Sequence, residues 1–166
     1  MTRGAVALTA VRPHSPAARA GLRPGDRLLA VDGLVPEDAV DVMYAIAEEQ
    51  FEVEVERTGR VRTAVVTRHM GQDWGAQMEP PAVRHCGNRC VFCFVDQMPP
   101  GLRPSLYVKD EDYRHSFLYG NYVTLSNTTR RDLERIKRLK LSPLYISVHA
   151  TEEPVRKKLL ARVRPR

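Results

Sequence analysis

The sequence lacks the segments that direct proteins into or across membranes. It contains no apolar run of about 18 residues, the length at which a stretch becomes a candidate transmembrane helix. The first residues, 1–6, carry one basic side chain and a short apolar run, but no hydrophobic region typical of a signal peptide. We therefore expect a cytoplasmic, reducing location and no membrane partner.

The chain also lacks a general excess of one charge. Its 26 basic and 20 acidic residues give a net charge of +6, and residues 156–166 alone carry six basic side chains and no acidic one. The rest of the chain is therefore balanced, which argues against a basic face on the fold. A basic tail can bind nucleic acid or acidic lipid, but it is more often a solvated helix face, so we do not expect a nucleic-acid partner.

Cysteine is scarce and confined to one place. The three cysteines, Cys86, Cys90 and Cys93, follow a C-x3-C-x2-C pattern. An odd number without a signal peptide argues against a disulfide framework. Three thiolates at this spacing can hold a metal centre, either a zinc ion completed by His85 or His69, or an iron–sulfur cluster. A four-iron cluster with three protein ligands leaves one iron open to a substrate or cofactor.

The first 80 residues predict a small β-rich domain. Apolar patterns and turn residues predict strands at 6–11, 27–31, 51–56 and 61–67, a short helix at 15–21 and a longer helix at 38–49. Ser15 can cap the short helix and Gly21 can end it. The apolar stripe expected on the longer helix consists of Val42, Met43, Ile46 and Ala47.

The stretch Ser-Pro-Ala-Ala-Arg-Ala-Gly-Leu-Arg-Pro-Gly-Asp at 15–26 resembles bacterial PDZ domains. The resemblance implies a groove between the strand near Leu8 and the helix near Val42, which would take an extended peptide or protein ligand by strand addition. The alternative is a PDZ-like module that only packs on its neighbour. The Gly- and Pro-rich region at 71–81 looks like a boundary, with Trp74 as an anchor between modules.

From residue 82 onward, strand and helix patterns alternate three times. We expect strands at 82–85, 122–125 and 144–148, with helices at 110–119, 126–139 and from 152 onward. Asp110 can cap the first of these helices. On the second, we expect an apolar stripe of Leu133, Ile136 and Leu139, with basic side chains such as Arg135 facing water. This order predicts βα units on a parallel sheet, where chemistry lies at the carboxyl ends of the strands. Those ends are the cysteine loop, residues 126–127 and residues 149–151, and we expect them to face one site.

The cysteine pattern, with Phe92 directly before the last cysteine, resembles the signature of radical S-adenosylmethionine (SAM) enzymes. The stretches at 92–97, 105–110 and 119–125 are similar to a PDZ-containing radical SAM family whose C-terminal half is a domain of unknown function. The resemblance implies a mixed α/β chain. A PDZ-like domain at 1–80 would precede the first three βα units of a partial radical SAM barrel at 81–166.

The resemblance also implies the cofactors. Cys86, Cys90 and Cys93 would hold a 4Fe-4S cluster that binds SAM and, with an electron donor, supports 5′-deoxyadenosyl radical chemistry on an unknown substrate. The candidate cofactor-binding residues are Phe92, Thr124, Ser126, Asn127, Ser147 and His149. Many radical SAM enzymes have Gly-Gly-Glu at the second strand end for the SAM amino group, whereas residues 124–127 are Thr-Leu-Ser-Asn.

A non-enzymatic interpretation stays open beside this one. In it, the chain is a PDZ adaptor whose C-terminal module is stabilised by a zinc ion on three cysteines and a histidine. Three βα units before residue 166 are also fewer than the resemblance implies for a radical SAM core. We therefore expect a fragment or truncated form that does not turn over SAM by itself.

Overall fold

A computed structural model describes residues 5–161, and the chain divides into two units, Met1–Pro81 and Ala82–Arg166. The predicted mixed α/β class is confirmed, with an antiparallel sheet in the first unit and a parallel strand pair in the second. Within residues 5–161, the helices are all too short or too polar to span a membrane. Three of the basic residues near the end, Arg162, Arg164 and Arg166, lie outside the described residues.

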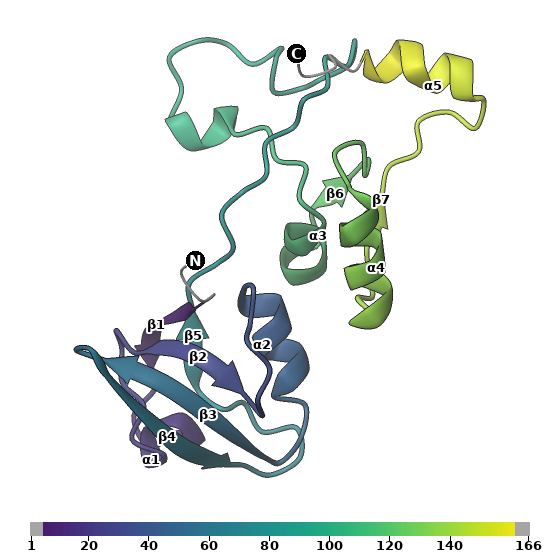
Figure 1. Ribbon diagram of the computed structural model, residues 1–166. Coiled ribbons are helices and arrows are strands. Elements are labelled where there is room, and N and C mark those ends of the chain that lie inside the picture. Colours follow the sequence, from purple (N-terminus) through teal and green to yellow (C-terminus); the bar gives the residue numbers. More distant parts are fainter. Residues whose placement is uncertain (1–4, 162–166) are drawn as a thin grey trace. The chain divides into compact units, whose positions relative to one another are not determined.

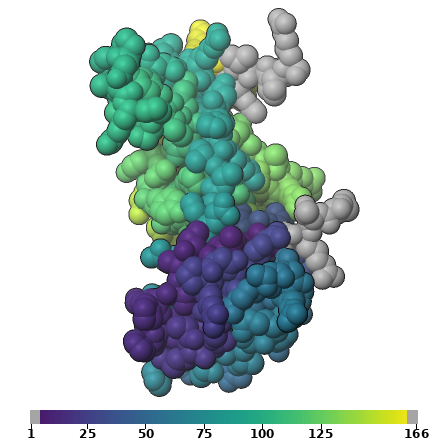
Figure 2. All heavy atoms as spheres, turned by 90° about the vertical axis from the view of Figure 1, so that its left-hand side faces the viewer, coloured from purple at the N-terminus to yellow at the C-terminus, as the bar shows by residue number. Residues whose placement is uncertain are grey.

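The first unit is built on a five-stranded antiparallel sheet in the order β4-β3-β2-β1-β5 (Figure 1). Its strands are β1 (Val6–Val11), β2 (Arg27–Val31), β3 (Gln50–Arg57), β4 (Arg60–Thr67) and β5 (Ala76–Met78), and its helices are α1 (Pro16–Arg19) and α2 (Ala39–Ala45). In the space-filling view, the purple-to-blue atoms of this unit form one continuous mass (Figure 2).

Local capping fixes where the two helices of the first unit begin and end. The Ser15 hydroxyl accepts the Ala18 N–H at 3.2 Å, and the chain leaves α1 through Gly21 at φ +79°. Asp38 caps α2 by accepting the Val40 N–H at 3.0 Å. Helix α2 ends at Ala45, so it is shorter than the helix predicted over 38–49.

The core of the first unit comes from strand alternation, as the sequence predicts. Phe51, Val53 and Val55 on β3 are fully buried, and each contributes roughly 1.5–3 kcal/mol of stabilisation by burial. Trp74 packs edge-on against Phe51, with 5.9 Å between the ring centroids, and belongs to the same core. The prediction of Trp74 as an anchor between modules is therefore wrong, because its indole is already buried within the first unit.

The buried face of α2 differs from the predicted stripe. Val42 and Ile46 are buried, but Met43 and Ala47 are exposed. Ala39 is also buried, and it forms an i, i+3, i+7 row with Val42 and Ile46. Val40 and Asp41 are buried as well, so the buried residues of α2 gather in its first turn.

The position of β1 changes the expected peptide groove. β1 pairs with β2 on one side, Val6 opposite Leu28, and with β5 on the other, Leu8 opposite Met78. Both edges of the strand near Leu8 are occupied, so it cannot accept a further strand. The three-residue β5, which the sequence analysis missed in the Gly- and Pro-rich region, covers it instead.

The second unit contains the parallel pair of β6 and β7, which lie side by side (Figure 1). Its elements are a 3-10 turn (Pro104–Tyr107), α3 (Tyr113–Tyr119), β6 (Tyr122–Val123), α4 (Arg130–Arg138), β7 (Tyr145–Ile146) and α5 (Glu153–Leu160). The register pairs Tyr122 with Tyr145 and Val123 with Ile146. The β6–α4–β7–α5 order has the predicted βα form, whereas the strand expected at 82–85 is reduced to one bridge between His85 and Asp110.

Two details of the second unit differ from the prediction for physical reasons. Helix α3 is capped by Asp112, not Asp110, because the Asp112 carboxylate accepts the Arg114 N–H at 3.0 Å. Arg135 on α4 was predicted to face water but is buried, and its guanidinium donates to the Tyr113 hydroxyl at 3.2 Å. Leu133, which was predicted to belong to the buried stripe of the same helix, is exposed.

Candidate functional site

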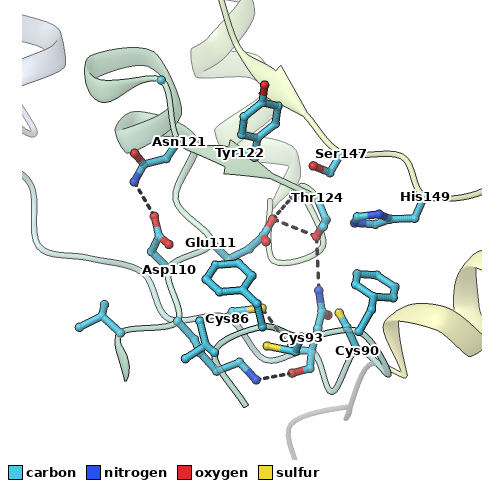
Figure 3. Close-up of a pocket in the computed structure, with 17 residues that line it drawn as sticks. Cys86, Cys90, Cys93, Asp110, Glu111, Asn121, Tyr122, Thr124, Ser147 and His149 are labelled. Atoms are coloured by element: carbon cyan, nitrogen blue, oxygen red, sulfur yellow. Dashed lines mark hydrogen bonds between the residues drawn. The ribbon is translucent and has the colours of Figure 1, made fainter. Parts of the chain in front are cut away.

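The second unit contains a pocket of about 550 Å³ at the carboxyl ends of β6 and β7 (Figure 3). Cys86, Cys90 and Cys93 all line it, with their sulfur atoms on one side of the pocket. A volume of this size is within the range of small-molecule and cofactor sites, and it exceeds what a single ion needs. The cysteine loop and the strand ends therefore meet at one site, as the topology of βα units leads one to expect.

Backbone hydrogen bonds give the cysteine loop its shape. The Cys93 N–H donates to the Cys90 carbonyl at 3.0 Å, which forms a turn between these two ligand candidates. The Cys86 N–H donates to the Lys109 carbonyl at 2.8 Å, and the Asn88 N–H reaches the Cys86 sulfur at 3.5 Å. All three cysteines are free thiols of intermediate burial. The loop thus presents three partly shielded sulfurs to the same pocket.

The electrostatics of the loop depend on burial and on one cation. Burial raises the pKa of the Cys86 thiol and of the Cys90 thiol above their ordinary values. Both are therefore protonated near neutral pH, and a metal centre would have to displace those protons. Lys109 donates to Asp96 at 2.7 Å, and this hydrogen bond raises the pKa of Lys109 and lowers that of Asp96.

Thr124, just after β6, is the centre of a polar network on the pocket wall. Its N–H and its hydroxyl both donate to the same oxygen of Glu111, at 2.6 and 3.0 Å. The Asn88 amide nitrogen donates to the Thr124 hydroxyl at 3.3 Å and to the Ser126 hydroxyl at 2.8 Å. Arg156 on α5 donates to the Thr124 carbonyl at 3.2 Å. The network links the cysteine loop to the end of β6.

The end of β7 brings an aromatic contact to the pocket. The His149 ring lies 4.6 Å from the Phe92 ring between centroids, with 50° between their planes. His149 has φ +64°, a left-handed conformation that few residues other than glycine adopt and that histidine tolerates better than most. The backbone therefore turns sharply at the strand end and directs this side chain toward the residue before Cys93.

The predicted cofactor-binding residues divide into two groups. Phe92, Thr124, Ser147 and His149 line the pocket. Ser126 and Asn127 do not line it: Ser126 accepts from Asn88, and Asn127 donates to the His85 carbonyl at 3.4 Å. These two residues therefore form hydrogen bonds with the segment around Cys86 and do not contribute to the pocket surface.

Sequence reasoning missed several polar residues that line the same pocket. They are Asn88, Lys109, Asp110, Glu111 and Asn121. The acidic run at 110–112 resembles a solvated surface segment, yet Glu111 is only 4% exposed. The signal that could have found it is its position, because it precedes a helix that leads directly into a strand of the βα series.

The donor set is compatible with an iron–sulfur cluster, because three thiols line one cavity. Within residues 5–161, no three His, Cys, Asp or Glu side chains converge closely enough to hold one metal ion. A four-iron cluster gives each cysteine its own iron, so the sulfurs need to line one cavity without meeting at a point. The Asn88 Oδ1 atom, buried on the pocket wall, has no hydrogen-bond partner among the described residues. A buried acceptor in that state can take a hydrogen bond from a bound group or from a water molecule.

Comparisons with known proteins agree with this arrangement. A radical SAM-like domain family matches residues 68–165, and a PDZ domain family matches residues 8–57. A comparison with curated proteins found no match.

Among solved structures, a form of the HtrA-type protease AlgW with a decapeptide is 26% identical, with a TM-score of 0.37. The match covers 48% of this chain and 23% of that one. The same type of protease with a tripeptide is 20% identical, with a TM-score of 0.29 over 47% of this chain and 32% of that one. The chain thus spans a quarter to a third of those proteins. The radical SAM-like match extends over more than half of the sequence, and so this chain belongs to the radical SAM-like family, with a PDZ domain in its N-terminal part.

Proposed function

We propose that the second unit binds a 4Fe-4S cluster through Cys86, Cys90 and Cys93 and binds SAM in the adjoining pocket. Its activity is 5′-deoxyadenosyl radical chemistry on a substrate that no residue identifies. The observation that carries the proposal is the shared pocket, which places all three free thiols beside the ends of two parallel strands. Membership of the radical SAM-like family supports the same assignment.

Zinc is the less favourable occupant. A structural zinc ion needs four ligands within about 2.0–2.3 Å of one point. No such group exists within the described part of the chain. His85, the nearest histidine in sequence, is exposed and pairs through its backbone with Asp110.

The residues of the chain have distinct roles in this proposal. A cluster held by Cys86, Cys90 and Cys93 would supply the electron for cleavage of the sulfonium bond of SAM, and the protein's part would be to bind, orient and exclude water. Phe92 and His149 offer aromatic faces for a flat purine ring beside Cys93. Glu111 and Asn88 fix Thr124, so the polar wall keeps one arrangement. An external electron donor completes the system.

Metal analysis after anaerobic reconstitution tests the proposal. We expect about four irons and four sulfides per chain, a brown colour and bleaching on reduction. Cys90→Ser should lose most of the colour because one of three ligands is missing. Ser142→Ala, which changes an exposed hydroxyl outside the pocket, is the matched control and should keep full iron content. A colourless protein that holds one zinc per chain would support the adaptor interpretation instead.

For the first unit we propose that an extended peptide adds to the outer edge of β5. This strand pairs with β1 along one edge, and within residues 5–161 no strand pairs with the other. The Glu79 N–H bonds to the Ala7 carbonyl at 2.8 Å, so the alternation of the strand directs the Met78 N–H away from β1. Strand addition is a common way in which PDZ domains take peptides.

A pair of substitutions at Met78 tests this edge. Met78→Pro removes the outward N–H, whereas Met78→Ala keeps it and removes only the side chain. Selection from a phage-displayed library of decapeptides would supply the ligand. We expect peptides selected on the wild type to bind Met78→Ala and to lose binding to Met78→Pro. Equal binding to both variants would show that the peptide docks elsewhere.

A further inference from the structure

Lys109 forms hydrogen bonds with the cysteine loop through both its backbone and its side chain. Its backbone carbonyl accepts the Cys86 N–H at 2.8 Å. Its ammonium donates to the Asn88 carbonyl at 3.1 Å, and Asn88 lies between the first two cysteines. The same ammonium donates to Asp96 at 2.7 Å, three residues beyond the last cysteine. One lysine therefore spans the loop from its first cysteine to the segment after its third.

The position of Lys109 makes it more than a surface cation. Its side chain lines the pocket that the three thiols line and is 23% exposed, while that of Asp96 is 50% exposed. A charge that is largely shielded from water acts on its neighbours with little screening, whereas a half-exposed charge is weakened by solvent and salt. Asp96 in turn forms a side-chain hydrogen bond with Cys93, so the cation and the anion both act on the thiol loop.

We propose that Lys109 and Asp96 form a charge pair that sets the reduction potential of the cluster. This inference rests on the proposed function. One-electron reduction by an external reductant such as dithionite adds one negative charge at the cysteine loop, with no bond made or broken. A fixed ammonium stabilises that added charge and raises the potential, and a neighbouring carboxylate opposes it. Lys109 is thus a positioning and tuning residue that does not itself bind iron.

The pair predicts shifts of opposite sign. Lys109→Met removes the cation and keeps the length of the side chain, so the midpoint potential should fall. Asp96→Asn removes the opposing anion beside Cys93, so the potential should rise. Lys109→Arg keeps the charge and should stay close to the wild type. Lys137→Met removes an exposed lysine of α4 that does not line the pocket, and it should leave the potential unchanged.

A purely structural salt bridge gives a different result. Lys109→Met and Asp96→Asn break the same ion pair, so a structural role would lower iron content in both variants and would not separate their potentials by sign. Spectroelectrochemical titration of the reconstituted protein measures the potential, and iron and sulfide assays measure occupancy. Both readouts are independent of turnover.

The outcomes separate the inference from the proposal beneath it. A wild type that takes up no iron and sulfide rejects the proposed function, and this inference with it. A wild type with a full cluster, but with equal potentials or same-sign shifts in the two variants, overturns the inference alone. Should Lys109→Met retain too little iron, Asp96→Asn decides by itself: a higher potential supports the charge pair, and an unchanged or lower one overturns it.

Discussion

Glu111 holds Thr124 through two hydrogen bonds to a single carboxylate oxygen, 2.6 Å from the Thr124 nitrogen and 3.0 Å from its hydroxyl. The Thr124 hydroxyl donates its single proton to Glu111, so its hydrogen bond with Asn88 can only be one that it accepts. The atom of the Asn88 amide that faces Thr124 is therefore its nitrogen. The Asn88 oxygen has no hydrogen-bond partner among the described residues. The orientation of one buried amide thus follows from a carboxylate on another element.

Loss of this carboxylate should weaken SAM binding more than cluster binding. In Glu111→Ala, the N–H and the hydroxyl of Thr124 lose their shared acceptor, and a buried donor left without an acceptor costs roughly 1–3 kcal/mol. We expect SAM affinity to fall about 5- to 150-fold, with iron content unchanged. Equilibrium dialysis of the reconstituted protein with labelled SAM measures it.

Two further variants calibrate that result. Glu111→Gln keeps an acceptor oxygen and should recover most of the affinity. Glu134→Ala removes an exposed carboxylate on α4 that pairs along the helix surface with Arg130, and it should bind SAM as the wild type does. Wild-type affinity in Glu111→Ala would show that the Thr124 network takes no part in SAM binding.

Gly75 should be intolerant of any side chain. It has φ +82°, and a Cβ there would lie 2.2 Å from the Ser15 Cβ, which belongs to the residue that caps α1. Gly33→Ala is the matched control, because Gly33 has φ +76° but a Cβ there would meet open space among the described residues. Both variants bear the strain of positive φ, of order 1–3 kcal/mol, and only Gly75→Ala adds a clash. Urea unfolding should show Gly75→Ala to be the less stable by at least about 1 kcal/mol; equal stabilities would contradict the steric argument.

Sequence patterns predicted the features that local chemistry determines. The Ser15 cap, the Gly21 exit and the alternation of Phe51 with its neighbours depend on adjacent residues, and the structure confirms them. Spacing also predicted that the three cysteines lie together, since they are close in sequence. Thr124 and His149 reach the same pocket because parallel strands end at one edge.

Features that depend on distant partners were harder to predict. Arg135 is buried because Tyr113, from another helix, offers it a hydroxyl. β5 is a strand because β1 lies beside it, although its three residues stand among glycines and prolines that favour loops. Glu111 faces inward because Thr124 donates to it twice. In each case the partner is more than ten residues away, and no local pattern records it.

Residues 1–81 should fold without the rest of the chain. Every member of the hydrophobic core of the first unit comes from residues between Val6 and Ala76, so its burial requires nothing downstream. We expect the isolated segment to unfold in one cooperative transition within a few degrees of the corresponding transition in the whole protein. Thermal melts followed by circular dichroism would show this, and a segment without a sigmoidal transition would overturn it.

The stability of the first unit should fall in acid because of Asp26. Burial by itself would raise the pKa of this fully buried carboxyl, but hydrogen bonds from Arg57, at 2.5 and 2.7 Å, and from the Arg23 N–H outweigh it and hold the pKa below the ordinary value. A carboxyl with a depressed folded-state pKa binds its proton more readily when unfolded. Its stabilisation is therefore present above the unfolded pKa of about 4, and it is lost as pH falls through the lower folded-state value.

Asp26→Asn tests this assignment, because it removes the charge and keeps the shape. We expect a loss of roughly 3 kcal/mol at neutral pH, since a buried pair that loses one partner leaves the other charge uncompensated. Below about pH 4 the wild type should lose stability faster than the variant, so their urea midpoints should converge. Asp73→Asn breaks the exposed pair with Arg12, whose side chains are 63% and 60% exposed, and it should change stability by less than about 1 kcal/mol at either pH. Parallel pH profiles for the wild type and Asp26→Asn would mean that another carboxyl governs acid unfolding.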